Sequence, residues 1–335
     1  MIRTLKLLAI ALVLCVSASA QWVNGAGASF PNPIYQKWFT EYSADHPGVQ
    51  INYQSLGSGA GIRQIIAGTV DFGGSDDPMT DEQLSECPVR ILHIPTVLGA
   101  VVPSYNIPGI KQELRFTPEL LADIFLGKID NWSDPAIAEV NPGVKLPNLP
   151  ILTVHRADAS GSTYMFTDYL SKVSSEWNST VGKNTSVKWP VGSGGKGNEG
   201  VAGQIRQIEG SIGYIELTYA LQNNISYGLV RNKRGYFVKA SLDSTAAAAT
   251  AAAANMPADY RVSITDPEGK DAYPIASFTW LLIPQQSRDT RKGRVLHDFL
   301  AWMLRDGQRE AATLTYVPLP QDVIQKLQAT ISTIH

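Results

Sequence analysis

The segment with the most hydrogen-bond donors in this sequence is HRADASGST, residues 155–163. A β-like run delivers an arginine, and a turn rich in hydroxyl groups and glycine then opens a helical pattern. The planar guanidinium group of arginine suits a tetrahedral oxyanion, and free N–H groups at a helix N-terminus attract negative charge. We therefore predict an oxyanion site here, and we regard a surface ion pair above a capped helix as the less favoured interpretation. The groups expected to bind are Arg156, Ser160, the Gly161 N–H and Ser162, with Asp158 holding the guanidinium.

Three earlier segments offer small residues with a hydroxyl or a carboxylate. GAGASFP (25–31) contains Ser29 as a donor, and its proline suits the start of a helix. GSGAG (57–61) contains Ser58, which can cap the helix that follows. DFGGSDDPM (71–79) places Asp76 after a strand end, where open α/β sheets bind ligands. Each segment alone fits an ordinary turn or cap, but two glycine-rich turns in one chain favour an anion site.

Two glycine-rich patterns fail the motifs for nucleotide binding. Phe30 stands where the Rossmann fingerprint needs its third glycine. In GSGGKGNEG (192–200), Gly197 follows the lysine where a Walker motif needs Ser or Thr. We interpret the second pattern as a loop near the hinge or a packing loop before a helix, and contact with a ligand stays open as the less favoured interpretation.

The sequence contains no pattern typical of catalysis or of metal binding. The five histidines show no HExxH spacing, and Cys87 has no evident partner. Neither Ser58 nor Ser160 lies in a G-x-S-x-G elbow. We therefore expect no catalytic residue, no metal and no cofactor.

Short β-like runs alternate with helical patterns along the chain, which is typical of an α/β protein. We predict strands at 49–56, 70–75, 92–105, 151–156, 211–217 and 276–284. We predict helices at 33–43, 62–67, 117–126, 162–171, 201–208, 291–305 and 321–334. An alanine-rich stretch beginning at Ser244 predicts a surface helix that ends before Pro257.

The first 20 residues have the three parts of a secretory signal peptide. Arg3 and Lys6 precede an apolar run too short to span a bilayer, and Ala18-Ser19-Ala20 suits signal peptidase. We expect cleavage after Ala20 and a soluble periplasmic protein. Removing both cations changes the net charge from −2 to −4, which argues against nucleic acid as a partner. A chain of residues 21–335 is long enough for two lobes.

Taken in order, five segments resemble the phosphate-binding proteins of bacterial high-affinity phosphate ABC transporters. They are GAGASFP, YQSLGSGAGIRQIIAGTVDFGGSD, HRADASGSTYMFTDYL, VKWPVGSGGKGNEG and YVPLP, and the similarity runs from about residue 24 to 331. The resemblance implies a two-lobed periplasmic-binding-protein fold of type II, with the lobes joined by two crossing strands near 103–107 and 272–277. Lobe 1 would comprise residues 21–105 and 276–335, and lobe 2 residues 106–275.

The resemblance also implies the ligand and its contacts. Inorganic phosphate would lie in the cleft between the lobes, and a monomer would deliver it to the permease subunits of the importer. The contacts carried over by position are Ser29, the Phe30 N–H, Ser58 and Asp76 from one lobe, and Arg156, Ser160, the Gly161 N–H and Ser162 from the other, with Asp158 supporting Arg156.

Three positions depart from the family pattern. Asp77 adds a carboxylate beside Asp76, and since neighbouring residues on an extended segment point to opposite sides, we expect it to face away from the anion. Ser162 replaces a usual threonine and keeps the hydroxyl, and the alanine-rich stretch replaces a more mixed segment. A receptor for sulfate or molybdate, or less favourably a secreted phosphatase, stays open as an alternative at this point.

Overall fold

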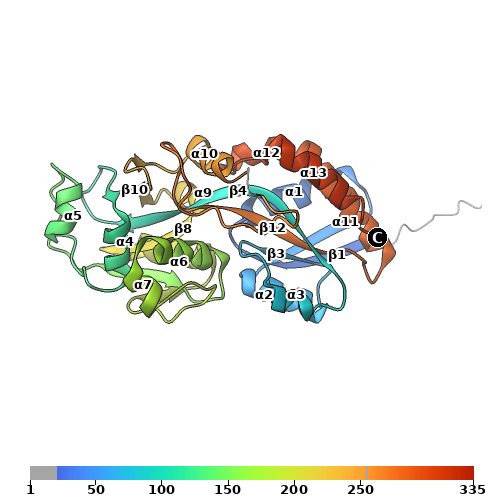
Figure 1. Ribbon diagram of the computed structural model, residues 1–335, viewed down its shortest axis with the longest axis horizontal. Coiled ribbons are helices and arrows are strands. Elements are labelled where there is room, and N and C mark those ends of the chain that lie inside the picture. Colours follow the sequence, from blue (N-terminus) through green and yellow to red (C-terminus); the bar gives the residue numbers. More distant parts are fainter. Residues whose placement is uncertain (1–20, 254–255) are drawn as a thin grey trace, which may run out of the picture.

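The computed structural model describes residues 21–253 and 256–335. The predicted signal peptide, residues 1–20, lies outside these residues. Figure 1 shows an elongated molecule with two lobes, and long strands run between them. The two-lobed α/β fold expected from the sequence is confirmed.

One sheet runs through both lobes in the strand order β2-β1-β3-β12-β4-β8-β6-β7, and β9 pairs with β4 beside this path. Its strands are β1 (Gln21–Gly27), β2 (Val49–Ser55), β3 (Phe72–Ser75), β4 (Ile91–Asn106), β6 (Leu152–Arg156), β7 (Ser193–Gly195), β8 (Ser211–Glu216), β9 (Ser226–Tyr227) and β12 (Ala276–Pro284). A small second sheet in the order β11-β10-β5 consists of β5 (Arg115–Phe116), β10 (Leu229–Arg231) and β11 (Phe237–Val238).

The long strand β4 joins the two halves of the sheet. Residues 91–100 pair antiparallel with β12, and residues 101–106 pair antiparallel with β8. Every residue of β4 before Asn106 is buried, as expected for an apolar strand covered on both faces. The partner of β4 changes between Ala100 and Val101, so one unbroken strand connects the two groups of strands.

Helices cover both faces of the sheet (Figure 1). In the first lobe they are α1 (Asn32–Asp45), α2 (Ser58–Ala67), α3 (Asp81–Ser85), α11 (Thr290–Trp302), α12 (Gln308–Ala311) and α13 (Gln321–Ile331). In the second lobe and at the hinge they are α4 (Pro118–Phe125), α5 (Pro135–Val140), α6 (Gly161–Val173), α7 (Ser175–Thr180), α8 (Gly197–Gln207), α9 (Leu217–Gln222) and α10 (Leu242–Ala253). The spacing of Tyr35, Trp38, Phe39 and Tyr42 gives α1 one apolar face, and all four side chains are buried in the core.

The strands and helices predicted from the sequence are confirmed, with shifted ends and two corrections. Helix α8 begins at Gly197, so the second half of the predicted glycine-rich loop is helical. The alanine-rich helix α10 is not only a surface helix, since Ala248 and Ala249 are buried. Strand β1 was not predicted, because its glycines carry no β-like signal.

The segment after α10 contacts both lobes. Arg261 donates to the Met79 carbonyl (2.9 Å) and pairs with Asp81 (2.7 Å) in the first lobe. Ser263 donates to the Asp168 carboxylate of α6 (2.7 Å) in the second lobe. This segment therefore ties the lobes together outside the sheet.

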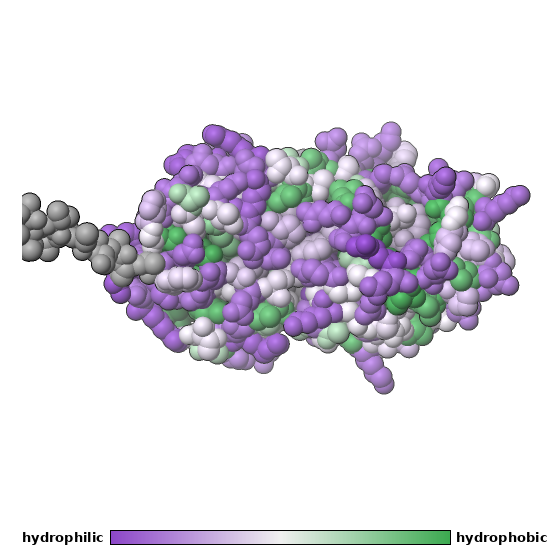
Figure 2. Space-filling view, turned by 180° about the vertical axis from the view of Figure 1, so that it is seen from behind, coloured by the Kyte–Doolittle hydropathy of each residue, from purple (hydrophilic) through white to green (hydrophobic). Residues whose placement is uncertain are grey.

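Among the described helices, none is both long and apolar enough to cross a membrane. On the face shown in Figure 2, hydrophobic residues lie in small areas separated by hydrophilic ones. This surface pattern fits a protein whose apolar residues are mainly inside its two lobes.

Candidate functional site

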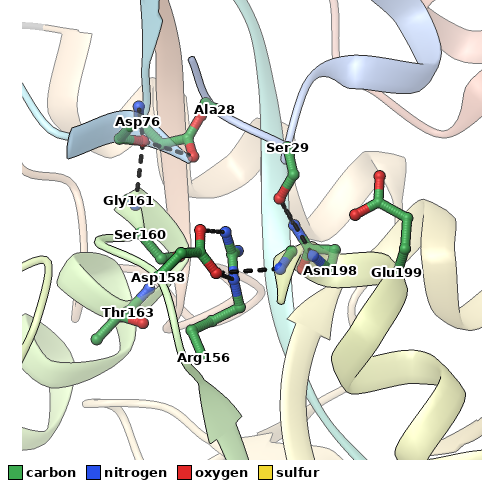
Figure 3. A network of polar contacts seen from close by, with 12 residues as sticks. Ala28, Ser29, Asp76, Arg156, Asp158, Ser160, Gly161, Thr163, Asn198 and Glu199 are labelled. Carbon is green, nitrogen blue, oxygen red and sulfur yellow. Dashed lines mark hydrogen bonds and ion pairs between the residues drawn. The ribbon is translucent and has the colours of Figure 1, made fainter. Parts of the chain in front are cut away.

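The residues predicted to bind an oxyanion meet where the two lobes touch. Figure 3 shows Ser29 and Asp76 from the first lobe facing Arg156, Asp158, Ser160 and Gly161 from the second. All the predicted contact residues are buried: Ser29, Phe30, Ser58, Asp76, Arg156, Ser160, Gly161 and Ser162. Since polar side chains are rarely buried without a partner, their concentration makes this junction the candidate site.

Arg156 is the last residue of β6, and its side chain is 1% exposed. Its Nε donates to Asp158 Oδ1 (2.8 Å) and its Nη2 to Asp158 Oδ2 (2.5 Å), which confirms the predicted pairing of these two residues. Burial by itself would raise the pKa of Asp158, but the hydrogen bonds and charge of Arg156 lower it below its ordinary value. Asp158 is thus an anion that fixes the guanidinium plane while leaving its remaining N–H groups for another acceptor.

The N-terminus of α6 lies beside this arginine. The Ser160 side chain caps the helix by accepting from the Thr163 N–H (3.2 Å), and its hydroxyl proton is not used by that bond. The Ser162 Oγ is buried and has no hydrogen-bond partner among the described residues. A buried hydroxyl without a partner is costly, so a ligand oxygen at this place would remove a penalty.

Ser58, Gly161 and Asp76 join the two lobes. Ser58 Oγ accepts from the Gly161 N–H (3.0 Å) and from the Asp76 N–H (3.2 Å). Ser58 is therefore not the N-cap of α2, as its position suggested; Gly57 holds that position without a side-chain bond. A Cβ on Gly161 would lie 2.5 Å from Asp76 Cβ and 2.6 Å from Ser58 Oγ, so only glycine allows this approach.

The Asp76 carboxyl follows β3 and is 2% exposed. Its Oδ1 accepts from Thr279 Oγ1 of β12 (2.7 Å), and the Ser58 hydroxyl lies 3.4 Å from its Oδ2. Burial raises the pKa of Asp76 to about 7, although Thr279, Arg156 and Ser58 act to lower it. Near neutral pH this carboxyl can therefore change between acceptor and donor.

Ser29 and Phe30 follow β1 at the start of α1. The Phe30 ring packs against Tyr316 in the core, and its carbonyl accepts from the Tyr316 hydroxyl (2.7 Å). No acceptor for the Phe30 N–H lies in the part of the chain that the structure describes. The Phe30 N–H, which the sequence predicted to contact the ligand, is therefore not used by another hydrogen bond within the described residues.

Asn198 is the site residue that sequence reasoning missed. It is fully buried in the first turn of α8, and it donates to Ser29 Oγ from its backbone N–H (3.2 Å) and from Nδ2 (3.0 Å). The Gly197 N–H of the same turn donates to Asp158 Oδ1 (3.0 Å). The only signal in the sequence is the glycine-rich pattern before a helix, which by itself favours a hinge-side or packing loop and leaves ligand contact open.

Asp77 lies apart from these residues. It lines a groove of about 1030 Å³ together with Tyr164, Lys183 and Arg261, and neither Asp76 nor Arg156 contributes to that groove. Burial, followed by the charge of Asp76, raises the pKa of Asp77 to about 7. This position fits the expectation that Asp77 faces away from the anion.

The arrangement can hold an anion, and it shows no catalytic constellation. Hydroxyl groups, N–H groups and a guanidinium supply donors, while the Asp76 carboxyl supplies an acceptor and the Asp158 carboxylate is paired with Arg156. The imidazole of His155 stacks on Trp189, with ring centroids 4.9 Å apart, and does not contact the serines. Within residues 21–253 and 256–335, no three His, Cys, Asp or Glu residues lie together as metal ligands would.

Comparisons with known proteins agree with the geometry. A family model described as a PBP superfamily domain matches residues 16–307. The chain is 47% identical over 315 residues to the phosphate-binding protein PstS of Pasteurella multocida, covering 94% of this chain and 91% of the relative. It is also 47% identical over 308 residues to the PstS of Xylella fastidiosa, covering 92% and 84%.

A solved structure shows the same fold. It is a putative phosphate ABC transporter substrate-binding protein with bound phosphate from Clostridium perfringens. The TM-score is 0.65 at 17% sequence identity, with 90% of this chain and 100% of that chain covered. The type II periplasmic-binding fold expected from the sequence is thereby confirmed.

Proposed function

The chain belongs to the PBP superfamily and, within it, to the phosphate-binding proteins named PstS, and on this premise we propose that it binds inorganic phosphate and delivers it to a membrane ABC importer. The observation that carries the proposal is the burial of four serines and one arginine around the Asp76 carboxyl at the junction of the lobes. These groups are Ser29, Ser58, Ser160 and Ser162 with Arg156, around Asp76.

In the proposed complex each lobe contributes part of the site. Arg156, the α6 N-terminus and the hydroxyl of Ser162 would donate to phosphate oxygens from the second lobe. Ser29, the Phe30 N–H and Ser58 would donate from the first lobe. Two lobes that share one ligand enclose it when they come together, which excludes water and strengthens each charged hydrogen bond.

Asp76 favours phosphate over sulfate or molybdate as the ligand. An ionised carboxylate can only accept, so it can bond a ligand oxygen only if that oxygen carries a proton. Phosphate near neutral pH carries at least one proton, whereas sulfate carries none. A bare sulfate oxygen facing a buried carboxylate would be repelled, and this repulsion gives selectivity.

The proposal includes the location and organisation of the protein. We propose a periplasmic binding protein that is not an enzyme, is monomeric, and loses its signal peptide after Ala20. The names of the relatives, which are those of binding proteins and not of enzymes, support the absence of enzymatic activity in this proposal. We also propose lobe 1 as residues 21–105 with 276–335 and lobe 2 as residues 106–275, with residues 256–262 lying against lobe 1 through Tyr260 and Arg261.

Titration calorimetry with phosphate, arsenate, sulfate and molybdate tests the proposal. We expect one phosphate per chain, with arsenate also bound and sulfate rejected. Hydrolysis of a chromogenic phosphate ester, measured in parallel, should stay at the level of buffer. Equal binding of sulfate and phosphate would contradict the assignment, and turnover of the ester would favour a phosphatase.

A further inference from the structure

Ser29 is held by the opposite lobe through both of its oxygen atoms. Its Oγ accepts two hydrogen bonds from Asn198 of α8, and its carbonyl accepts one from the Tyr219 hydroxyl of α9 (2.7 Å). Ser29 is 1% exposed and Asn198 is fully buried, so water does not compete for these bonds. The contact therefore sets the orientation of the Ser29 hydroxyl.

The orientation of the Asn198 amide is defined by its other end. Asn198 Oδ1 accepts from the Glu216 N–H (3.0 Å), which can only donate. The oxygen of the amide must therefore face Glu216, and the NH₂ group must face Ser29. Asn198 reaches Ser29 as a donor on both contacts.

Two donors leave the serine hydroxyl with only one role. A serine hydroxyl has two lone pairs and one proton, and the two N–H groups of Asn198 occupy both lone pairs. The hydroxyl proton must then point away from Asn198, and no acceptor for it lies among the residues that the structure describes. Ser29 thus presents a proton, and no lone pair, toward the site.

We propose that Asn198 is a positioning residue that makes the Ser29 hydroxyl an obligate donor to the bound anion, and that it does so only when the lobes are together. This inference rests on the proposed function. Asn198 belongs to α8 in the second lobe and Ser29 to the first, so separating the lobes frees the hydroxyl to rotate. Orientation of a donor is then coupled to closure, and the ligand oxygen at Ser29 must be one without a proton.

Complementary roles for Ser29 and Asp76 follow from this. Asp76 in its ionised form accepts from the protonated oxygen of phosphate, and Ser29 donates to an unprotonated one. Two residues of the site would then depend on which oxygen of the ligand carries the proton. When the lobes separate, Asn198 no longer orients the Ser29 hydroxyl, and the weaker hydrogen bond to the ligand favours release.

A double-mutant cycle between Ser29 and Asn198 tests the proposal. Phosphate affinity is measured by calorimetry, and the rate of phosphate release by stopped-flow tryptophan fluorescence, for Ser29→Ala, Asn198→Ala and the double variant. Losing one directed hydrogen bond of this kind corresponds to about a tenfold weaker affinity, and we expect it mainly as faster release. In the Ser29→Ala background the change at Asn198 should alter affinity less than about twofold, since no hydroxyl remains to be oriented.

Two further variants separate this role from a structural one. Asn198→Asp keeps the acceptor for the Glu216 N–H but replaces the NH₂ donor with a charged oxygen, and it covers the case in which Asn198→Ala does not fold. It should weaken phosphate binding more than Asn198→Ala does, because its carboxylate attracts the Ser29 proton and also repels the anion, and only the first of these effects is absent in the Ser29→Ala background. Asn148→Ala, at an exposed asparagine of the second lobe, serves as the matched control and should bind like the native protein.

Each outcome bears on one of the two proposals. If the native protein does not bind phosphate, the proposed function fails, and this inference fails with it. If phosphate binds but Asn198→Ala and Asn198→Asp cost the same in the native and Ser29→Ala backgrounds, only the inference is overturned. A loss of phosphate affinity in Ser29→Ala that Asn198→Ala does not increase further supports the inference.

Discussion

Asp76 and Asp77 are neighbours in the chain, yet their carboxyl groups have different surroundings. Asp76 contacts Thr279 and Ser58 at the junction of the lobes, whereas Asp77 lines a groove with Lys183. Burial raises the pKa of each to about 7. Only Asp76 lies among the proposed phosphate contacts, so only its protonation state can affect which anion binds.

The Asp76 carboxyl predicts a selectivity that depends on pH. Because its pKa is raised to about 7, it is ionised above that pH and increasingly protonated below it. The ratio of phosphate to sulfate affinity should therefore rise between pH 5.5 and 8.5. The Asp76→Asn side chain can donate at any pH, so this variant should have a smaller ratio that depends less on pH. Calorimetry of both proteins with both ions checks this. An unchanged ratio in Asp76→Asn would move the selectivity to another residue.

Among the proposed ligand residues, we expect substitution of Arg156 to weaken phosphate binding the most. Removing one member of a buried, charge-assisted pair typically costs about 2–5 kcal/mol of binding free energy. Arg156→Ala should thus weaken phosphate binding more than Ser58→Ala or Ser160→Ala, and Arg156→Lys should be intermediate because it keeps charge and loses the planar fork. Arg294→Ala, at an exposed position of α11, is the control. Unchanged affinity in Arg156→Ala would place the anion elsewhere.

Among the helices, α6 serves both the site and the connection between lobes. Its N-terminus carries Ser160 and Gly161, and about two turns further on Asp168 is 1% exposed within a cluster of cations and hydroxyls. Asp168 accepts from Lys183 (2.7 Å) and Ser263 (2.7 Å) and pairs with Lys172 (3.0 Å). Burial alone would raise the pKa of Asp168, but these partners, with Lys183 first, lower it to about 2.

This cluster predicts a stability that depends on pH. A lowered pKa means that Asp168 contributes stability above its ordinary pKa of 3.8 and loses it as the pH falls toward about 2. Asp168→Asn should lower the free energy of unfolding by about 1–3 kcal/mol at pH 7, because the hydrogen bonds of a buried charge are weakened. The difference from the native protein should shrink between about pH 4 and pH 2. Urea unfolding measures this difference in the free energy of unfolding, with Asp130→Asn, at an exposed position, as the control. A difference that stays constant with pH would argue against an ionised Asp168.

At the scale of the whole molecule, closure depends on close backbone approach. Gly161 of one lobe lies against Asp76 and Ser58 of the other, and the Gly59 N–H donates to the Ala159 carbonyl (3.0 Å). These contacts bring together segments about 80 to 100 residues apart in sequence, which neither lobe can form alone. The ligand groups of the two lobes therefore converge only in this arrangement.

A single methyl group at Gly161 should oppose closure. Gly161→Ala places a Cβ 2.5 Å from that of Asp76, so we expect weaker phosphate binding and a smaller decrease in the radius of gyration on adding phosphate. In the native protein, a hundredfold excess of phosphate over the dissociation constant should add about 2.7 kcal/mol of stability. Small-angle scattering and thermal melting provide the measurements. Gly203→Ala is the matched control, because nothing lies within 4 Å of the added atom; equal behaviour of the two variants would contradict the predicted closure.

Export is also a property of the whole chain. If residues 1–20 act as a signal peptide, the exported protein should begin at Gln21. Intact mass spectrometry of periplasmic material checks the first residue. A protein that begins at a lipidated Cys15 would instead be anchored to the membrane, and the proposed location would be wrong.

The sequence by itself determined the local parts of the site. Apolar runs of strand length predicted β4 and β12, and the glycine-rich turns predicted where helices α2 and α6 begin to within a few residues. The pair Arg156 and Asp158 could be predicted because the residues are two positions apart, so their contact depends on local backbone geometry. Such features need no knowledge of how the strands are ordered.

Only the tertiary structure decided which of these parts meet. Asn198 contacts Ser29 across 169 positions, and Thr279 contacts Asp76 across 203. These contacts depend on the order of strands in the sheet and on the change of partner along β4, and local periodicity does not encode either. Ser58 shows the same limit: its sequence position suggested a helix cap, but the approach of Gly161 from the other lobe makes it an acceptor between the lobes. Long-range packing, with the loss of water that accompanies it, assigned the final role of each polar group.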